Sequence, residues 1–360
     1  MSETHKVRFE PVGVDIEVEE TETVLDAAFR QGVMLMHGCK EGQCSACKSF
    51  LLDGDVQLDR YSTFALADYE SDEGYVLLCR THAYSDLEIE LINYDEDMIR
   101  SGLPVVTASA RVLDLHDLTH DITRLVLQLE PGTALRYHPG QYLDIHLPDS
   151  SPDRPEHRSF SMASPPTPDG RLEFIIKRYP GGRFSSLLAG ALAVGDELQV
   201  TGPYGAFTLR ASSDRPIVMI GGGAGMAPIL ALLRQLAESG NERPVAFYYG
   251  ARTERDLFHH NEMMALRERL PGLTFVPCLS EAWPADWTDR PPDHPGGPGG
   301  ETGLVTEVLD RREGVLADHD IYLCGPPPMI DAALAMLESA GVPREQVFFD
   351  KFTITAPADD

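Results

Sequence analysis

The chain has 360 residues and 42% hydrophobic content, so it is long enough for two or three domains with cores of their own. Asp and Glu outnumber Lys and Arg by 57 to 30, and the formal net charge of -27 argues against nucleic acid or an anionic membrane as a partner. Residues 216–233 form an uncharged run, but its glycines and Pro228 predict a buried strand, a turn and a helix start, not a membrane span.

The N-terminal part alternates apolar and polar residues, as half-buried strands do. This pattern predicts strands at residues 6–9, 14–18, 75–79 and 87–91. Between the second and third of them, Thr23 and Asp26 form a capping box at the start of a helix that runs to Arg30. Gly32 is the expected C-terminal stop of that helix.

Four cysteines carry the strongest chemical signal of the chain. Cys39, Cys44 and Cys47 follow the spacing C-x4-C-x2-C, and Cys79 comes later, which is the plant-type ligand pattern of a [2Fe–2S] cluster. A structural zinc site usually has two short cysteine pairs, whereas the second half here is one isolated cysteine. Gly42 suits a loop whose backbone must approach the cluster closely. We therefore predict that these four thiolates ligate a [2Fe–2S] cluster.

The location in the cell is expected to be cytoplasmic. The first residues of the chain contain no apolar signal segment. Only Cys278 and Cys324 remain outside the ligand pattern, and an iron–sulfur site requires reduced thiols.

Negative charge is concentrated in residues 1–98, which hold 22 Asp and Glu against 7 Lys and Arg. This surface either keeps the protein soluble or docks on a basic face of an electron acceptor, and charge alone does not decide between the two. Residues 99–104 are expected to be a linker, because the segment is broken by Gly and Pro.

Residues 105–211 are predicted to form a small antiparallel barrel, because short apolar strands are separated by Gly and Pro turns. The clearest of these strands lie at 124–129, 141–147 and 172–177. Two motifs in this region suit a flavin nucleotide. Arg158 can neutralise a phosphate, Phe160 can lie against a flat ring, and Ser161 can hydrogen-bond a ring nitrogen.

The second motif is Ile176-Lys-Arg-Tyr-Pro-Gly-Gly-Arg-Phe-Ser185. Gly181 and Gly182 leave the helix that follows with a bare N-terminus, which is a suitable place for a pyrophosphate. Each motif alone is weak, since Pro-Gly-Gly is usually only a turn. Their occurrence in order, downstream of an iron–sulfur loop, favours flavin binding.

Residues 212–360 alternate strand and helix patterns, which predicts a doubly wound parallel sheet. The expected strands are 217–220, 245–249, 273–276 and 321–323, and the expected helices lie near 226–238, 260–269, 303–311 and 328–340. Residues 281–301 show no period and are expected to be a long mobile surface loop.

The first strand of this region is followed by Gly221-Gly-Gly-Ala-Gly225 and then Pro228 at a helix start, the context required of a dinucleotide-binding loop. Because Pro228 replaces the third glycine, the match to the usual fingerprint is partial. After the second strand, Glu254 could bind a ribose hydroxyl, whereas Arg252 and Arg255 could bind a 2′-phosphate. Cys278 has no motif around it and is expected in the core.

The order of these motifs resembles the ferredoxin–NADP reductase superfamily. The resemblance implies that Phe160 packs on the isoalloxazine ring and that Ser161 faces flavin N5. The superfamily's own form of the glycine motif ends in Pro, as at Pro228, and its Cys-Gly-Pro-x-x-Met motif matches Cys324 to Met329. That cysteine lies near the nicotinamide C4 in the family. The tail, Phe348 to Phe352, resembles the family's terminal segment, with Asp350 where the family usually has Glu and Phe352 as an aromatic that covers the flavin.

A ferredoxin region before the flavin and nucleotide regions is similar to the reductase components of soluble di-iron monooxygenases of the propane, phenol and methane type. The resemblance implies a multidomain fold: a β-grasp ferredoxin domain (1–98, α+β), a linker (99–104), an all-β FAD-binding barrel (105–211) and an α/β NAD(P)-binding domain (212–360). It also implies electron flow from NADH through FAD and [2Fe–2S] to a di-iron hydroxylase. The predicted catalytic residues are Ser161, Cys324 and Asp350, and the predicted metal ligands are Cys39, Cys44, Cys47 and Cys79.

The predicted cofactor-binding residues are Arg158, Ser159, Phe160, Ser161, Ile176, Lys177, Gly181, Gly182, Ser185, Gly223, Gly225, Pro228, Arg252, Cys324, Gly325 and Phe352. Two alternatives stay open. The reductase of a ring-hydroxylating Rieske dioxygenase has the same architecture and differs only in its electron acceptor. A redox-sensing flavoprotein regulator would bind a partner without turnover.

Overall fold

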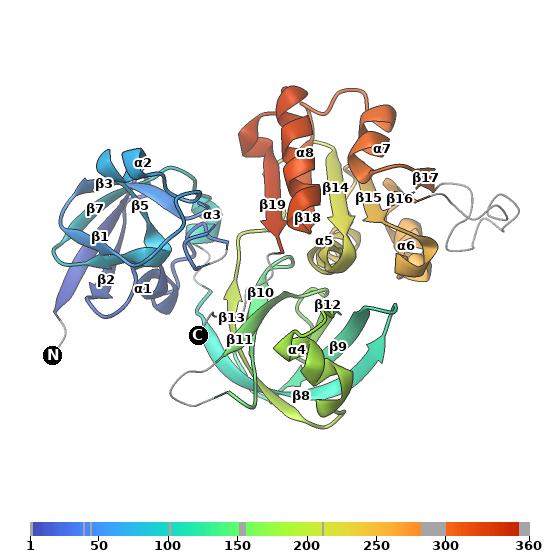
Figure 1. Ribbon diagram of the computed structural model, residues 1–360, viewed down its shortest axis with the longest axis horizontal. Coiled ribbons are helices and arrows are strands. Elements are labelled where there is room, and N and C mark those ends of the chain that lie inside the picture. Colours follow the sequence, from blue (N-terminus) through green and yellow to red (C-terminus); the bar gives the residue numbers. More distant parts are fainter. Residues whose placement is uncertain are drawn as a thin grey trace, which may run out of the picture. The chain divides into compact units, whose positions relative to one another are not determined.

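The computed structural model describes residues 3–38, 40–43, 45–100, 103–150, 156–210, 212–281 and 300–352 (Figure 1). The chain forms two compact units. The first unit contains the chain up to Thr107 and two returning segments, Ala134–Tyr137 and Thr201–Ala206. The second unit contains the other described residues. Within the described residues no helix is long and apolar enough to cross a membrane.

The first unit is built on a five-stranded sheet with helix α1 (Val24–Arg30) packed against it. The strand order is β2 (Val14–Glu19), β1 (Thr4–Glu10), β7 (Leu87–Leu91), β3 (Lys48–Asp53) and β5 (Tyr75–Leu77). The pairing of β1 with β7 is parallel and the other pairs are antiparallel. Period-two alternation buries one face of β1, β2 and β7, as at Val7 and Phe9 on β1. A small sheet of β4 (Val56–Leu58) and β6 (Thr81–Ala83) and the short helices α2 (Asp68–Asp72) and α3 (Glu96–Ile99) complete the unit.

Two local expectations for this unit have different outcomes. The predicted N-cap is confirmed, because the Thr23 side chain accepts a hydrogen bond from the Asp26 N–H at 3.2 Å. The Asp26 carboxylate accepts the Thr23 hydroxyl, so the second bond of a capping box is not the one observed. The expectation that Cys79 lies on a strand is wrong. Strand β5 ends at Leu77, and Leu78–Arg80 forms a 3₁₀ turn. The Leu78 N–H donates to the Cys47 carbonyl at 3.2 Å, and this bond holds the turn beside the ligand loop.

The segment between β7 and the barrel, which contains the expected linker, begins with the short helix α3. Asp95 caps α3 by accepting a hydrogen bond from the Met98 N–H at 3.0 Å. Met98 and Ile99 are buried in the core of the first unit. The domain boundaries at 98, 104 and 211 remain predictions.

A six-stranded sheet forms the barrel. Its order is β11 (His157–Ser161), β10 (Tyr142–His146), β13 (Glu197–Tyr204), β8 (Val106–Asp117), β9 (Ile122–Leu129) and β12 (Arg171–Lys177). An antiparallel bridge between Met162 and Phe174 brings the two edge strands together, so the barrel is nearly closed. The short helix α4 (Arg183–Ser186) follows β12.

A parallel sheet with helices on both faces forms the rest of the second unit (Figure 1). Its strand order is β17 (Glu301–Thr302), β16 (Leu273–Leu279), β15 (Val245–Ala251), β14 (Ile217–Gly222), β18 (Asp320–Gly325) and β19 (Val347–Lys351). Helices α5 (Met226–Glu238) and α6 (His260–Arg269) share one core with the sheet. Helices α7 (Val305–Arg312) and α8 (Pro327–Ser339) share the other.

All four expected helices and all four expected strands of this sheet are confirmed. Strand order reverses at β14, whose neighbours are β15 and β18. The carboxyl ends of β14 and β18 therefore form the topological switch point, where open α/β sheets bind ligands. The expected mobile loop, 281–301, lies mostly outside the described residues.

We expect Thr23→Ala to lower the free energy of unfolding of the first unit by about 1 kcal/mol, because the first turn of α1 loses its side-chain acceptor. Thr23→Ser keeps the hydroxyl oxygen and is the matched control. Urea unfolding of the full chain, followed by the visible absorbance of the bound iron–sulfur cluster, isolates this unit. Equal losses in the two variants would contradict the capping role.

Candidate functional site

Two of the four predicted cluster ligands, Cys47 and Cys79, lie within the described residues, and their side chains lie close together. The Sγ atoms of Cys47 and Cys79 lie 3.3 Å apart and both residues are buried. This separation is too long for a disulfide, whose S–S bond is about 2.0 Å, and it suits two thiolates directed at one metal centre. Cys39 and Cys44 lie outside the described residues.

The backbone between these ligands is tightly coiled. Lys40 and Ser45 adopt positive φ angles of 58° and 60°, which non-glycine residues rarely do, and Gly42 has φ of 70°. A Cβ atom on Gly42 would lie 2.8 Å from the Cβ of Tyr61. The Ser62 N–H donates to the Gly42 carbonyl at 3.0 Å. The donor set and this anchored loop fit the plant-type cluster that the sequence predicts.

His37, just before the ligand loop, was not singled out from the sequence. Its Nδ1 lies 2.7 Å from the Leu35 carbonyl, and its Nε2 accepts the Gly205 N–H at 2.8 Å. These two partners define the tautomer, with the proton on Nδ1. The Lys40 Nζ lies 3.4 Å from the centre of the Tyr204 ring. Within the first unit, the returning segment Thr201–Ala206 therefore contacts the residues on either side of Cys39.

Strand β11 carries the first predicted flavin motif. The Arg158 guanidinium donates to the His157 carbonyl at 2.7 Å, and no carboxylate in the described part of the chain forms an ion pair with it. Such a cation is available to a phosphate. The Ser159 hydroxyl is already used, because it donates to the buried Asp144 carboxylate at 2.6 Å. The Phe160 ring packs on Phe184 at 4.6 Å between centroids.

The second motif supplies a turn and a cation. Gly181 has φ of +74°, and Gly182 caps α4. The Ser185 hydroxyl accepts the Tyr179 N–H at 2.9 Å, so it shapes the turn. Ile176 is buried, and only its backbone could face a cofactor. The Lys177 ammonium lies 3.2 Å from the Asp121 carboxylate.

The glycine turn at the end of β14 is pressed against β18. A Cβ atom on Gly225 would lie 2.1 Å from the Cys324 carbonyl oxygen, so only glycine fits. Gly223 has φ of +57°, and its carbonyl accepts the Tyr249 hydroxyl at 3.2 Å. Pro228 lies in the first turn of α5, where its missing N–H has no helical partner to lose.

Ser161, Cys324 and Asp350 come together from β11, β18 and β19. Cys324 and Asp350 are paired in register, and the Ser161 hydroxyl lies close enough to the Asp350 carboxylate to lower its pKa. Burial raises the pKa of the Cys324 thiol well above its ordinary value, and the nearby Asp350 charge adds to this. Cys324 is therefore an uncharged thiol. Burial also raises the pKa of Asp350 to about 6, although the Ser161 hydrogen bond opposes the shift.

The other residues predicted for the nucleotide-binding part lie at several separate positions. Gly325 lies directly after Cys324, and its carbonyl accepts the Phe352 N–H at 3.0 Å. Arg252 is exposed and pairs with Asp256 at 3.6 Å. It belongs to a hollow of about 260 Å³ lined by His120, Arg252, Thr253, Arg255, Asp256 and Glu281. Cys278, predicted to be a core residue, is fully buried and its thiol donates to the Val276 carbonyl.

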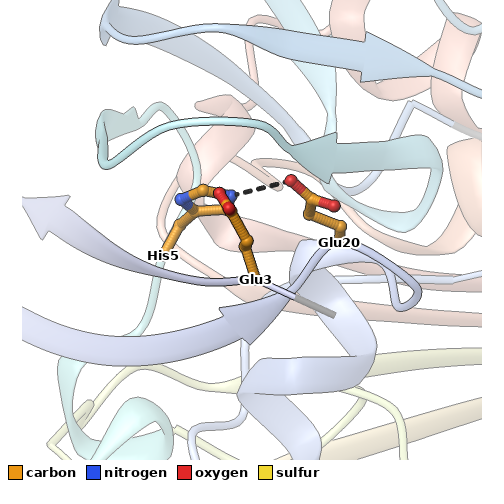
Figure 2. A group of neighbouring side chains, drawn as sticks. All are labelled: Glu3, His5 and Glu20. Atoms are coloured by element: carbon orange, nitrogen blue, oxygen red, sulfur yellow. Dashed lines mark hydrogen bonds and ion pairs between the residues drawn. The ribbon is translucent and has the colours of Figure 1, made fainter. Parts of the chain in front are cut away.

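Figure 2 shows a separate group at the end of the β1–β2 hairpin, made of Glu3, His5 and Glu20. Their side-chain ligand atoms lie within 4.8 Å of one another, and the His5 Nε2 lies 3.3 Å from the Glu20 carboxylate. Glu3 is exposed. We assign this group to an ion pair that joins neighbouring strands.

Comparison with known protein families finds three domains in chain order. Residues 7–84 match the 2Fe-2S iron-sulfur cluster binding domain, residues 109–209 the oxidoreductase FAD-binding domain, and residues 219–334 the oxidoreductase NAD-binding domain. The metal, flavin and nicotinamide regions found above coincide with these three matches.

Full-length relatives share this arrangement. The chain is 52% identical over 354 residues to the reductase component of propane 2-monooxygenase from Mycolicibacterium goodii, with 98% of each chain covered. It is 35% identical over 355 residues to the phenol hydroxylase P5 protein of Acinetobacter pittii, with 98% and 96% covered. Among solved structures, the Amycolatopsis cytochrome P450 reductase GcoB is similar with a TM-score of 0.83 at 29% identity, covering 98% and 99% of the two chains.

We expect Asp350→Asn to gain stability relative to the wild type as pH rises. Because the pKa of Asp350 is about 6 in the folded chain and 3.8 ordinarily, the folded state holds the proton more tightly than the unfolded state. Stability contributed by this proton is present below the lower value and lost as pH rises through about 6. Urea unfolding of the flavin-free protein between pH 4.5 and 8 measures the difference. A gap that does not vary with pH would contradict the shift.

Proposed function

The chain belongs to the family of reductases that join a [2Fe–2S] domain to FAD-binding and NAD-binding domains, and on that basis we propose that it is the reductase component of a propane-type di-iron monooxygenase. It is an oxidoreductase that passes electrons from NADH through FAD to the iron–sulfur cluster. The observation that carries the more specific proposal is 52% identity over 98% of both chains to a propane 2-monooxygenase reductase component, against 35% for the phenol hydroxylase protein.

The division into modules follows from the chemistry. FAD, when bound, takes a hydride from NADH, and the iron–sulfur cluster carries electrons singly. The protein's own residues bind and orient these groups. Arg158 offers a cation for a flavin phosphate, and Phe160 offers an apolar face. The Ser161 hydroxyl lies beside the Asp350 carboxylate and favours its charged form. The buried Cys324 thiol is a small uncharged group at the switch point.

The electron acceptor is proposed to be a di-iron hydroxylase. A Rieske oxygenase is the alternative, since its reductases share the architecture. Mixing the reduced protein with a purified propane monooxygenase hydroxylase, and in parallel with a Rieske oxygenase, tests this directly. Turnover with the Rieske protein alone would overturn the proposal.

We expect Cys79→Ser to leave the reduction of flavin by NADH unchanged and to abolish delivery to the acceptor. The variant loses a buried thiolate of the first unit, whereas the predicted flavin residues belong to the second. Anaerobic stopped-flow absorbance measures flavin reduction, and reduction of an artificial one-electron acceptor measures delivery. Undiminished delivery would refute a serial path through the cluster.

The surface beside the ligand loop suits a docking partner. Phe64 is 96% exposed, which is rare for a phenylalanine, and Tyr69 is 66% exposed. Phe64 lies two residues from Ser62, which is hydrogen-bonded to Gly42 of the ligand loop. The part of the chain that carries this patch has excess negative charge, since residues 1–98 hold 22 acidic residues against 7 basic ones. We propose that an acceptor with a basic rim and an apolar centre docks here.

We expect Phe64→Ala to raise the KM for the acceptor about tenfold, because an exposed aromatic anchor is lost, while the rate of flavin reduction stays unchanged. Val315→Ala, which truncates another largely exposed apolar residue in the second unit, is the matched control. Added salt should raise the KM further, as for any docking between opposite charges. An unchanged KM for Phe64→Ala would place the docking surface elsewhere.

A further inference from the structure

Helix α5 begins at the glycine turn and carries one partly buried cation, Arg234. Its Nη1 donates to the Ala163 carbonyl at 2.8 Å and to the Glu173 carboxylate at 3.0 Å. Its Nε donates to the Glu262 carboxylate at 2.7 Å. Ala163 and Glu173 belong to the barrel, whereas Glu262 belongs to α6. One guanidinium therefore joins the barrel to two helices of the nucleotide-binding part of the same unit.

The barrel contacts of Arg234 lie close to the predicted flavin site. Ala163 is two residues after Ser161, and its N–H donates to the Glu173 carbonyl at 2.7 Å. The bridge between Met162 and Phe174, which nearly closes the barrel, lies between these two positions. At the other end of the same helix, Gly225 caps α5 and touches Cys324. A single rigid helix thus connects the glycine turn with the strand that presents Ser161.

Ion pairs hold Arg234 of α5 to the barrel and to α6. The side chains of Arg234 and Glu173 are 18% and 11% exposed, so their ion pair is weakly screened. Burial raises the pKa of Glu262, but the His259 hydrogen bond and the Arg234 charge outweigh it and lower the pKa to about 2. For Glu173, the hydrogen bond from Arg124 and the charge of Arg234 likewise outweigh burial and lower the pKa. Both carboxylates that hold Arg234 are therefore in their charged form at neutral pH.

We propose that Arg234 is a positioning residue that sets the distance between the nicotinamide and flavin sites. Hydride transfer requires the reacting atoms to be held about 3–3.5 Å apart, and a displacement of about 1 Å can cost a factor of 10² in rate. A planar guanidinium reaches three acceptors on three elements at once, which a lysine ammonium on a flexible stem does not do in the same geometry. This role concerns only the step from NADH to flavin and does not depend on which oxygenase accepts the electrons.

The test compares Arg234→Lys with Arg243→Lys in the loaded holoenzyme. Arg243 is a matched control, because it is 15% exposed and forms an ion pair with the buried Asp320. Unlike the Arg234 network, this ion pair does not reach the barrel, since Arg243 and Asp320 both lie in the nucleotide-binding part. Anaerobic stopped-flow measures the limiting rate of flavin reduction and the Kd for NADH separately. We expect Arg234→Lys to slow the limiting rate about tenfold with little change in Kd, and deuterated NADH to show a larger isotope effect. Arg243→Lys should leave both quantities near the wild type.

A second readout does not require turnover. Hydrogen exchange of the flavin-free protein should accelerate for Arg234→Lys in residues 161–165 and in α5, and not for Arg243→Lys. If Arg234→Lys does not fold, Glu173→Gln, which removes the barrel-side charge, should show the same split between rate and Kd. A limiting rate within about twofold of the wild type in the folded Arg234 variant, or an equal slowing in the Arg243 control, would overturn the proposal.

Discussion

The second unit depends on the close approach of two backbone turns at the carboxyl ends of β14 and β18. A side chain at Gly225 would lie within 2.1 Å of the Cys324 carbonyl oxygen, so the two turns can meet only because one of them has no Cβ. Parallel register then pairs Cys324 with Asp350 on β19, and the Ser161 hydroxyl of the barrel lies beside Asp350. The site at the switch point is therefore a consequence of backbone packing, and its side chains follow from that packing.

The two units perform different parts of one task, and the physical chemistry of each suits its part. The predicted flavin and nicotinamide residues belong to the second unit, where buried ion pairs and a nearly closed barrel hold groups at fixed distances. The first unit exposes an aromatic side chain and a large excess of negative charge next to a coiled ligand loop. A hydride donor must be held in one geometry, whereas an outgoing electron requires only a close approach to a partner.

Much of this could be predicted from the sequence, because the signals are local. Thr23 and Asp26 predict a helix start, and periodic apolar residues predict the strands and helices of the parallel sheet. The prediction for Cys79 was wrong because the apolar run from Tyr75 suggested a continuous strand, whereas the chain turns into a 3₁₀ helix after Leu77. His37 and Arg234 were missed for a different reason. The partner of His37 is 168 residues away, and those of Arg234 are 28, 61 and 71 residues away, separations that no local pattern reveals.

The segment Thr201–Ala206 belongs to the first unit although it continues a strand of the barrel. Its Gly205 N–H satisfies the buried His37 imidazole, so a fragment that ended at Thr107 would keep the ligand loop and lose one of its supports. Gene fusion and domain exchange are common ways for electron-transfer chains to acquire new members. In this chain a ferredoxin module moved as one continuous stretch would leave behind a hexapeptide of its own unit, which lies nearly one hundred residues downstream.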